Sequence, residues 1–266
     1  MTTLLPNLLT AQLPVLALCM MRPLGMMLLL PLFKGGAMGS ALIRNSLILM
    51  FALPTVLAMD EMQPILQQAD TWMLISLFGK EIIVGMLLGF CAAIPFWAID
   101  MAGFVIDTMR GASMSTVLNP LMGLQSSIYG MLFTQVLTVL FLVSGGFNFL
   151  LTALYQSYQQ LPPGFNLTLS QPLMVFIAHE WQLMCQLCLS FAMPAMVIMI
   201  LVDVALGLVN RSAQQLNVFF LSMPIKSALV LLLLIYSLQF ALSHYLQTIS
   251  GVEQHVDILF GLLAGH

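Results

Sequence analysis

The stretch Met199–Lys226, MILVDVALGLVNRSAQQLNVFFLSMPIK, places a polar cluster between two long apolar runs. Asp203 lies in the first run, Lys226 begins the second, and Arg211 lies between them. Apolar runs separated by a short polar connection are typical of two helices joined by a turn. We therefore expect a helix, a polar turn and a second helix here. Similar apolar runs and polar connections continue towards the N-terminus.

The composition excludes an ordinary soluble globular protein. Of the 266 residues, 61% are apolar and 6% are charged, whereas soluble domains contain about 25% charged residues. Several apolar runs approach or exceed the roughly 20 residues that cross a bilayer core. The sequence therefore predicts an all-α, polytopic membrane protein with long kinked helices and helical hairpins, folded as a single domain over residues 1–266. The net charge of −3 is sparsely distributed, and no basic patch indicates nucleic-acid binding.

Six apolar segments are expected to be helical. Their approximate bounds are 8–33, 39–59, 71–99 with a continuation to Gly111, 126–158 with a break at Gly145-Gly146, 172–209 and 224–249, followed by a short tail. The fifth segment is too long for one crossing, so we expect Pro194 to divide it or much of it to leave the membrane. In a topology with six crossings, the basic residues fall on one side of the membrane and both termini lie outside.

Charged residues interrupt these apolar segments. Arg22 precedes Pro23 near the middle of the first segment, so this polar position must face protein or water rather than lipid. Lys80 and Glu81 are adjacent and point about 100° apart on a helix, so each needs its own partner. We expect the buried charges to pair within the chain or across subunit contacts.

The end of the third segment carries a second pair of charges. Asp107 and Arg110 are three residues apart, which makes them neighbours on one helical face. Gly111 follows directly and is well placed to end the helix. This pair could also be a solvated surface ion pair of small energy.

Several of these residues occur together in an order that resembles one family. They are Arg22, Gly25 and Pro31-Leu32-Phe33; Glu81, Gly85, Gly89 and Phe90; Ala102-Gly103, Asp107 and Arg110-Gly111; Gly145-Gly146; and Pro194, Val202-Asp203, Leu206-Gly207, Gln215-Leu216-Asn217-Val218-Phe219, Pro224 and Lys226. The chain thus resembles the T-type export-apparatus proteins of type III secretion systems, the SpaR- and FliR-like family. Gln214 stands where many relatives have proline, and Met109 where many have glutamine. Arg110-Gly111-Ala112 looks more like injectisome members than flagellar ones.

This resemblance implies a structural subunit of the bacterial inner-membrane export gate. The implied partners are the R-type and S-type gate subunits, the U-type switch protein, the V-type export gate protein, exported unfolded polypeptides and membrane lipids. The implied assembly is a helical bundle around a closed protein-conducting channel, partly displaced towards the periplasm.

Some residues are candidates for subunit contacts or gating. They are Arg22, Glu81, Asp107, Arg110, Gly111, Met114, Asn119, Met122, Asp203, Arg211, Gln215, Asn217, Pro224 and Lys226. Among them, Met114, Asn119 and Met122 belong to the linker 113–125, which we expect to face the channel. Arg211, Gln215 and Asn217 are the contacts expected at the polar turn of Met199–Lys226.

No catalytic or cofactor-binding constellation is recognisable. His179 and Glu180 adjoin, but no nucleophile or metal-ligand set lies at useful spacing, and Cys185 and Cys188 fit core packing better than a redox or metal site. We therefore expect no enzymatic activity, metal or cofactor. A small-solute transporter or ion channel remains an alternative, because broken helices and intramembrane charges also occur there. A membrane scaffold without conduction is a third possibility.

Overall fold

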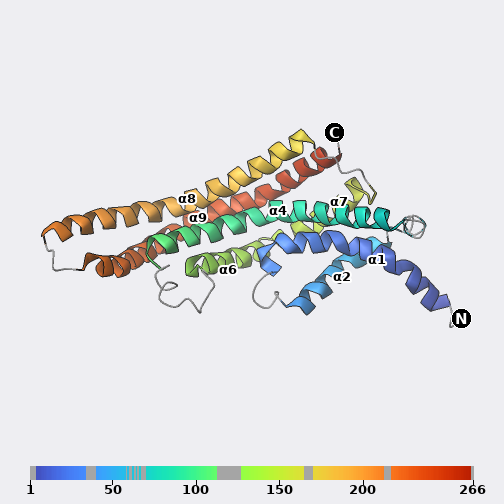
Figure 1. The fold of residues 1–266 in the computed structure, drawn as a ribbon, viewed down its shortest axis with the longest axis horizontal. Coiled ribbons are helices and arrows are strands. Elements are labelled where there is room, and N and C mark those ends of the chain that lie inside the picture. Colours follow the sequence, from blue (N-terminus) through green and yellow to red (C-terminus); the bar gives the residue numbers. More distant parts are fainter. Residues whose placement is uncertain are drawn as a thin grey trace. The chain divides into compact units, whose positions relative to one another are not determined.

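The computed structural model describes residues 4–33, 40–57, 59, 62, 64, 66, 70–112, 127–164, 170–212 and 217–264. These residues form helices and connections, with no strand among them (Figure 1). The helices are α1 (Leu4–Leu29), the short 3-10 helix η1 (Pro31–Phe33), α2 (Ala41–Leu57), α4 (Thr71–Met109), α6 (Ile128–Val143), α7 (Gly146–Gln160), α8 (Gln171–Ser212) and α9 (Val218–Ala264). The all-α expectation is confirmed.

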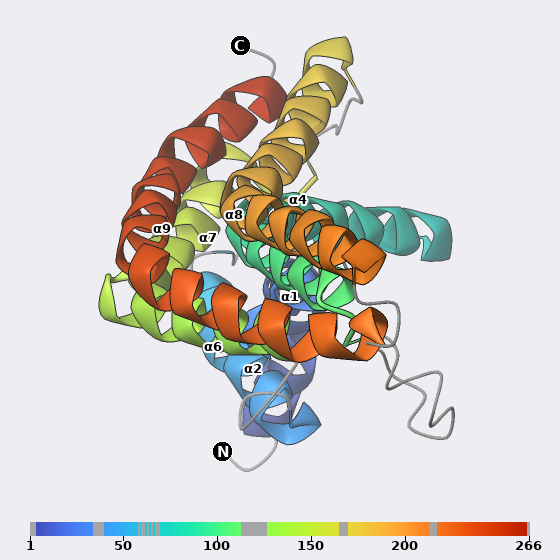
Figure 2. The same cartoon turned by 90° about the vertical axis from the view of Figure 1, so that its left-hand side faces the viewer.

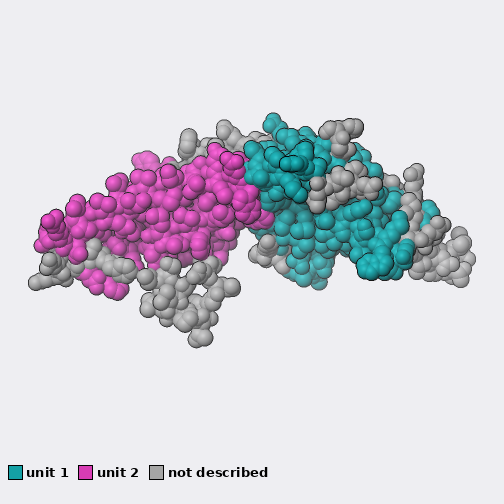
Figure 3. All heavy atoms as spheres, turned by 45° about the horizontal axis from the view of Figure 1, so that its top comes forward, with its two compact units in different colours: residues 1–93, 144–180, 249–266 teal, residues 94–143, 181–248 magenta. Residues whose placement is uncertain are grey.

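The helices form two compact units, which are coloured separately in Figure 3. Unit 1 consists of residues 1–93, 144–180 and 249–266, and unit 2 of residues 94–143 and 181–248. α4, α8 and α9 each contribute residues to both units. A single domain over residues 1–266 stays a prediction.

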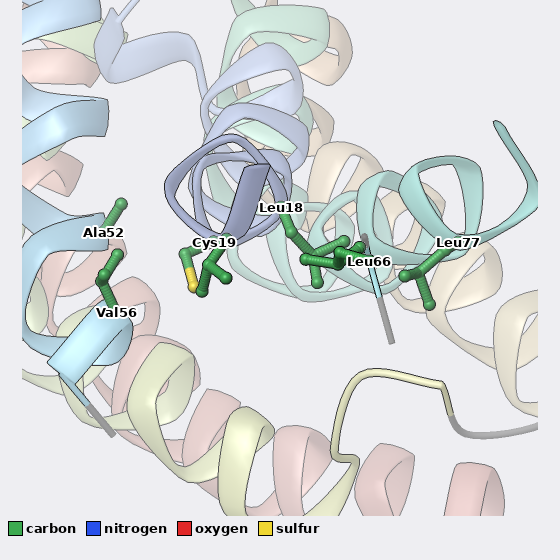
Figure 4. Close-up of a cluster of buried hydrophobic side chains, with 7 residues drawn as sticks. Leu18, Cys19, Ala52, Val56, Leu66 and Leu77 are labelled. Carbon is green, nitrogen blue, oxygen red and sulfur yellow. The ribbon is translucent and has the colours of Figure 1, made fainter. Parts of the chain in front are cut away.

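Unit 1 contains a hydrophobic cluster between α1, α2 and the start of α4. Its buried residues are Val15, Leu18, Cys19, Ala52, Val56, Leu66 and Leu77. In Figure 4, Ala52 and Val56 of α2 lie beside Cys19 of α1, and Leu18 lies next to Leu66. Burial of these apolar side chains holds the first two helices together and fixes the position of α1 in the unit.

Glycines allow α1 and α4 to approach at backbone distance. A Cβ atom placed on Gly85 of α4 would lie 2.2 Å from the carbonyl oxygen of Arg22 in α1, and one on Gly89 would lie 2.6 Å from that of Met26. The contact at Gly25 of α1 is similarly close, since a Cβ added there would lie 2.4 Å from the carbonyl oxygen of Ile82. Small residues at helix contacts are typical of membrane proteins, where close packing replaces the hydrophobic effect as the driving force.

In unit 2, α6 runs antiparallel to the second part of α4. Gly103 packs against the backbone of Gly130 near one end of this contact, and Phe96 meets Phe141 edge to face, with ring centroids 5.4 Å apart, near the other. α6 and α7 meet at an angle of 70°, and Gly145 between them adopts the left-handed conformation with φ +84°. The expected break at Gly145-Gly146 is confirmed.

α8 and α9 form an antiparallel hairpin (Figure 1 and Figure 2). Asp203 of α8 pairs with Lys226 of α9 in unit 2, and Glu180 pairs with His255 in unit 1. The two expected helices are therefore present, and the polar residues 213–216 between them lie outside the described residues. Of the two alternatives for the fifth segment, division at Pro194 is wrong, because α8 continues through Pro194 without interruption, and departure of much of it from the membrane stays a prediction. Neighbouring helices can compensate for the hydrogen bond that an internal proline removes.

The last helix is also longer than expected. α9 starts at Val218, before Pro224, and continues to Ala264. The residues expected to form a tail are therefore part of this helix as far as Ala264, His255 among them.

Fewer helices fit a membrane crossing than the six expected. Among the described residues, three are long and apolar enough: α1 over Gln12–Leu29, α4 and α8. The bent pair α6 and α7 would make a fourth if it forms one span. The apolar stretch of α2, Ala41–Val56, is shorter than 18 residues. The same holds for the two described stretches of α9, Phe220–Tyr236 and Gln254–Leu263. The chain is a multi-pass membrane protein by these criteria, and the six-crossing topology stays a prediction.

Candidate functional site

The buried charges of unit 1 centre on Arg22 of α1. Its guanidinium is 1% exposed and pairs with the carboxylate of Glu81 on α4, which is also buried. Nε donates to one carboxylate oxygen, and Nη2 donates to the other over 3.2 Å. This two-point contact suits the planar guanidinium, which matches both oxygens of a carboxylate.

Residues of α7 complete the surroundings of Arg22. Nη1 donates to the hydroxyl of Ser157 over 3.0 Å, and Nη2 also donates to the carbonyl oxygen of Leu161 just after the helix. The ring of Tyr158 lies 4.3 Å from the guanidinium carbon, and its hydroxyl donates to the carbonyl oxygen of Cys19 over 2.8 Å. Arg22 therefore joins α1, α4 and α7 through one side chain.

The second charged cluster lies at the C-terminal end of α4, in unit 2. Arg110 Nε is 2.7 Å from Asp107 Oδ1, as their spacing predicts. Asp107 is buried and the Arg110 side chain is 16% exposed, so this is not the solvated surface pair that we considered as an alternative. Gly111 follows with φ +92°, the left-handed conformation that ends many helices.

Asp107 also binds the start of α6. Its Oδ2 accepts a hydrogen bond from the Ser127 hydroxyl over 2.7 Å and another from the Tyr129 amide over 3.1 Å. Arg110 stacks over the Tyr129 ring, with its guanidinium carbon 4.5 Å from the ring centroid. These contacts connect residues 107–112 to residues 127–130, the two described ends that flank residues 113–126.

The third charged cluster joins three helices around Lys226. Its ammonium lies 2.6 Å from Asp203 Oδ1 on α8 and donates to the carbonyl oxygen of Met109, the last residue of α4, over 3.3 Å. Lys226 is buried, whereas the Asp203 side chain is 51% exposed. The pairing satisfies one of the free carbonyl oxygens that every helix leaves at its C-terminus. Met223 of α9 packs on Gly111, where an added Cβ would lie 3.3 Å from its side chain.

The remaining predicted site residues have different environments. Arg211, in the last turn of α8, and Asn217, before α9, are exposed, as is Pro224 within α9. Exposure is compatible with subunit contacts, but that role stays a prediction. Gln215, Met114, Asn119 and Met122 lie outside the described residues.

Sequence reasoning missed a fourth pair, between α8 and α9 in unit 1. Nδ1 of His255 is 2.6 Å from Oε1 of the buried Glu180, and Nδ1 of the exposed His179 is 3.9 Å from the same oxygen. The side-chain hydrogen bond to Glu180 raises the pKa of the His255 imidazole above its usual value. The only sequence signal was an acid within the long apolar run of α8, which required a partner but did not identify it.

Sequence reasoning also missed Ser157 and Tyr158 around Arg22. Both lie in a polar stretch near the end of α7, where the expected helical segment 126–158 also ends. Nothing in that stretch indicates contact with a residue almost 140 positions earlier.

These clusters hold helices together and show no catalytic geometry. Each described ion pair joins side chains of this chain, and Arg22, Lys226 and Asp107 also bind backbone groups. In the part of the chain that the structure describes, no three histidine, cysteine, aspartate or glutamate side chains are placed to hold a metal ion. The fold and these sites define an all-helical, multi-pass membrane protein whose buried charges pair within and between its own helices.

The chain belongs to the bacterial export proteins, family 1, whose sequence pattern matches residues 13–252. It is 48% identical over 231 residues to the secretion system apparatus protein SsaT of Salmonella typhimurium, covering 87% of this chain and 89% of that protein. It is 37% identical over 256 residues to the Yop proteins translocation protein T of Yersinia pestis, covering 95% and 97% of the two chains. Identity to the flagellar biosynthetic protein FliR of Bacillus subtilis is 33% over 178 residues, covering 65% and 66%.

Proposed function

We propose that this chain is a structural subunit of the inner-membrane export gate of a type III secretion system of the injectisome kind. The main support is sequence identity. The chain is 48% identical, over most of both chains, to a secretion system apparatus protein, but 33% identical over a shorter region to a flagellar relative. The subunit would form part of a closed protein-conducting channel for unfolded polypeptides. No catalytic activity is proposed, and the energy for transport would come from other components.

Apolar surface on α8 supports a role inside a larger assembly. Leu201, Val204 and Leu208 follow one another at helical spacing and are each more than half exposed. Lipid alone could cover such a surface, but a helical gate would place other subunits there. The R-type and S-type subunits are the proposed neighbours, with the U-type and V-type proteins as further partners.

Copurification tests this assignment. Tagged chain, expressed with its candidate partners and extracted in mild detergent, is expected to purify as a stable complex with several smaller hydrophobic proteins. A functional homo-oligomer would support the small-solute transporter or ion channel instead. Leu208→Lys should remove partner subunits, because it places a charge in the exposed apolar row of α8.

Asn210→Lys is the matched control for Leu208→Lys. Asn210 is an exposed polar residue two positions away, so the variant adds the same charge to the same helix on a different face. It should leave the complex intact. Equal loss of partners from both variants would mean that added charge, not this apolar face, disrupts the assembly.

The linker 113–125 is the proposed channel-facing segment of this subunit. The supporting observation is the contact network of Asp107 and Arg110, which holds both described flanks of that linker. Photo-crosslinkers at Met114, Asn119 and Met122 should react with a substrate stalled during export. Labelling of these positions by lipid probes, without substrate adducts, would contradict a channel-facing position.

The assembly is proposed to lie in the bacterial inner membrane, with part of it displaced towards the periplasm. Displacement would explain why the chain has long apolar helices but only three or four candidate spans among its described residues. Accessibility of introduced cysteines to a membrane-impermeant thiol reagent measures this directly. Residues of α8 near Asp203 are suitable positions because they are exposed in the isolated chain.

A further inference from the structure

Unit 1 carries an apolar groove along α4, separate from the charged clusters. It has a volume of about 290 Å³ and is open to the surroundings. It is lined by Leu29 of α1, by Ile83, Met86, Leu87 and Phe90 of α4, and by Ile177 of α8. All six lining side chains are apolar, so the groove suits a hydrocarbon occupant.

Lys80 of α4 is not part of the groove lining but lies on the same side of the helix as two residues that are. It precedes Ile83 by three residues and Leu87 by seven, so it shares their side of α4. Its neighbour Glu81 faces α1 instead, where it pairs with Arg22. Lys80 is half-buried, and within the described residues no carboxylate forms an ion pair with it.

Lys80 lies just before an uncharged run of α4 that is long enough to cross a bilayer core. The 18 residues Ile82–Ile99, which follow the Lys80-Glu81 pair, contain no charged side chain, and Asp100 follows them. At about 1.5 Å per residue, this run extends for about 27 Å, close to the thickness of a bilayer hydrocarbon core. A lysine just outside such a run reaches the headgroup layer with its ammonium.

We propose that Lys80 and the groove form a binding site for an anionic phospholipid. The ammonium of Lys80 binds the phosphate, and one acyl chain lies along Ile83, Leu87 and Phe90. Lys80 has no carboxylate partner among the described residues. Its positive charge therefore favours an anionic lipid over a neutral one. A bound lipid would fill the groove and stabilise the packing of α1 on α4, which both line it. This inference goes beyond the proposed function and requires only that α4 is embedded in a membrane.

Lipid retention by the purified assembly tests the site. The chain, extracted with its partner subunits, is exchanged into detergent containing equal amounts of phosphatidylglycerol and phosphatidylcholine with identical acyl chains. Bound lipid is then quantified by mass spectrometry. Phosphatidylglycerol should be retained preferentially, and Lys80→Gln should lower its apparent affinity about fivefold, the factor that about 1 kcal/mol per basic residue represents. Lys80→Arg should preserve the preference.

Two further variants separate headgroup binding from nonspecific lipid contact. Arg44→Gln removes a partly exposed cation from α2, which contributes no residue to the groove lining, and should leave lipid retention unchanged. Met86→Trp fills the groove while Lys80 remains, and should also reduce phosphatidylglycerol retention. Equal retention of both lipids by the wild type, or equal effects of Lys80→Gln and Arg44→Gln, would overturn the proposal.

A photo-crosslinker at Met86 identifies the occupant in intact membranes. Adducts with phospholipid support the proposal, and adducts with a partner subunit would replace it with a protein contact. Subunit composition is measured on the same samples. Normal composition without preferential lipid retention would refute the lipid site and leave the gate assignment standing. Preferential lipid retention by a homo-oligomer would support the lipid site and contradict the gate assignment.

Discussion

Arg22 and Glu81, 59 residues apart in the chain, form an ion pair that is almost completely closed to solvent. The pair forms where Gly85 brings the backbones of α1 and α4 into contact. Close packing therefore excludes water from the charges, and the two-point hydrogen bonding compensates for part of the desolvation penalty. Because Arg22 also binds Ser157 and Leu161, the same interaction fixes α7.

Glu81→Gln should strongly destabilise the protein, because it leaves the guanidinium of Arg22 buried without its counter-charge. Removing one partner of a buried pair costs about 3–5 kcal/mol. The expected result is a large drop in the midpoint of thermal unfolding in detergent. Arg44→Gln, which removes a partly exposed cation without an ion-pair partner among the described residues, should change stability by no more than about 0.5 kcal/mol.

The double variant Arg22→Met with Glu81→Met should be less destabilised than the sum of the two single variants, because no isolated charge remains. Additive losses would show that the two side chains act independently. That result would contradict the role assigned to their pairing.

Gly85→Ala should separate α1 from α4, because the added Cβ would overlap the backbone of Arg22 rather than a movable side chain. Overpacking of this kind costs about 1–3 kcal/mol. Gly79→Ala is the matched control on the same helix, since no atom lies within 4 Å of a Cβ there. It should be neutral or stabilising by up to about 1 kcal/mol through higher helix propensity. The midpoint of thermal unfolding is measured for both variants and for the wild type. A Gly85→Ala protein as stable as the wild type would refute the close contact.

Reversing the charge of Asp203 should impair subunit assembly and secretion, because Asp203→Lys places two cations together at the junction of α4, α8 and α9. The double variant Asp203→Lys with Lys226→Asp restores opposite charges and should recover part of both subunit assembly and secretion. Assembly is measured by copurification and secretion by substrate in the medium. The register role proposed for this pair fails if Asp203→Lys leaves both intact.

Stability should fall as the pH is raised through the folded-state pKa of His255. That pKa is raised, so protonated His255 contributes stability that is fully present below the unfolded-state pKa, about 6.5, and lost at higher pH. Thermal unfolding between about pH 6 and pH 9 measures this loss, and His255→Gln should reduce it. His179→Gln should retain it, since that side chain is 66% exposed and lies farther from Glu180. Identical pH profiles of stability for the wild type and His255→Gln would show that the His255–Glu180 pair does not cause the loss of stability at higher pH.

Much of the local structure could be predicted from the sequence. Apolar runs indicated the helices, Gly145-Gly146 indicated the break before α7, and Arg110-Gly111 indicated the end of α4. These features depend on neighbouring residues, whose backbone preferences and spacing are visible in the chain itself. The order of charged and glycine residues also identified the family.

Prolines and helix lengths were less predictable. Pro194 and Pro224 look like helix boundaries, yet α8 and α9 continue through both. Proline removes one backbone hydrogen bond, but packing against another helix can outweigh that local cost. The number of crossings stays a prediction, because hydropathy shows that a segment is apolar, not whether lipid or protein covers it.

The sequence by itself determined that charges within its apolar runs needed partners, because an isolated charge in a low-dielectric interior is too costly to persist. Only the tertiary structure decided which partners they have: Glu81 for Arg22, Asp203 for Lys226 and His255 for Glu180. Each pair joins different helices, so its formation depends on which helical faces pack together. That choice is made by backbone approach at glycines such as Gly85 and by apolar packing along whole helices, both of which depend on the matching surfaces of two helices distant in the chain.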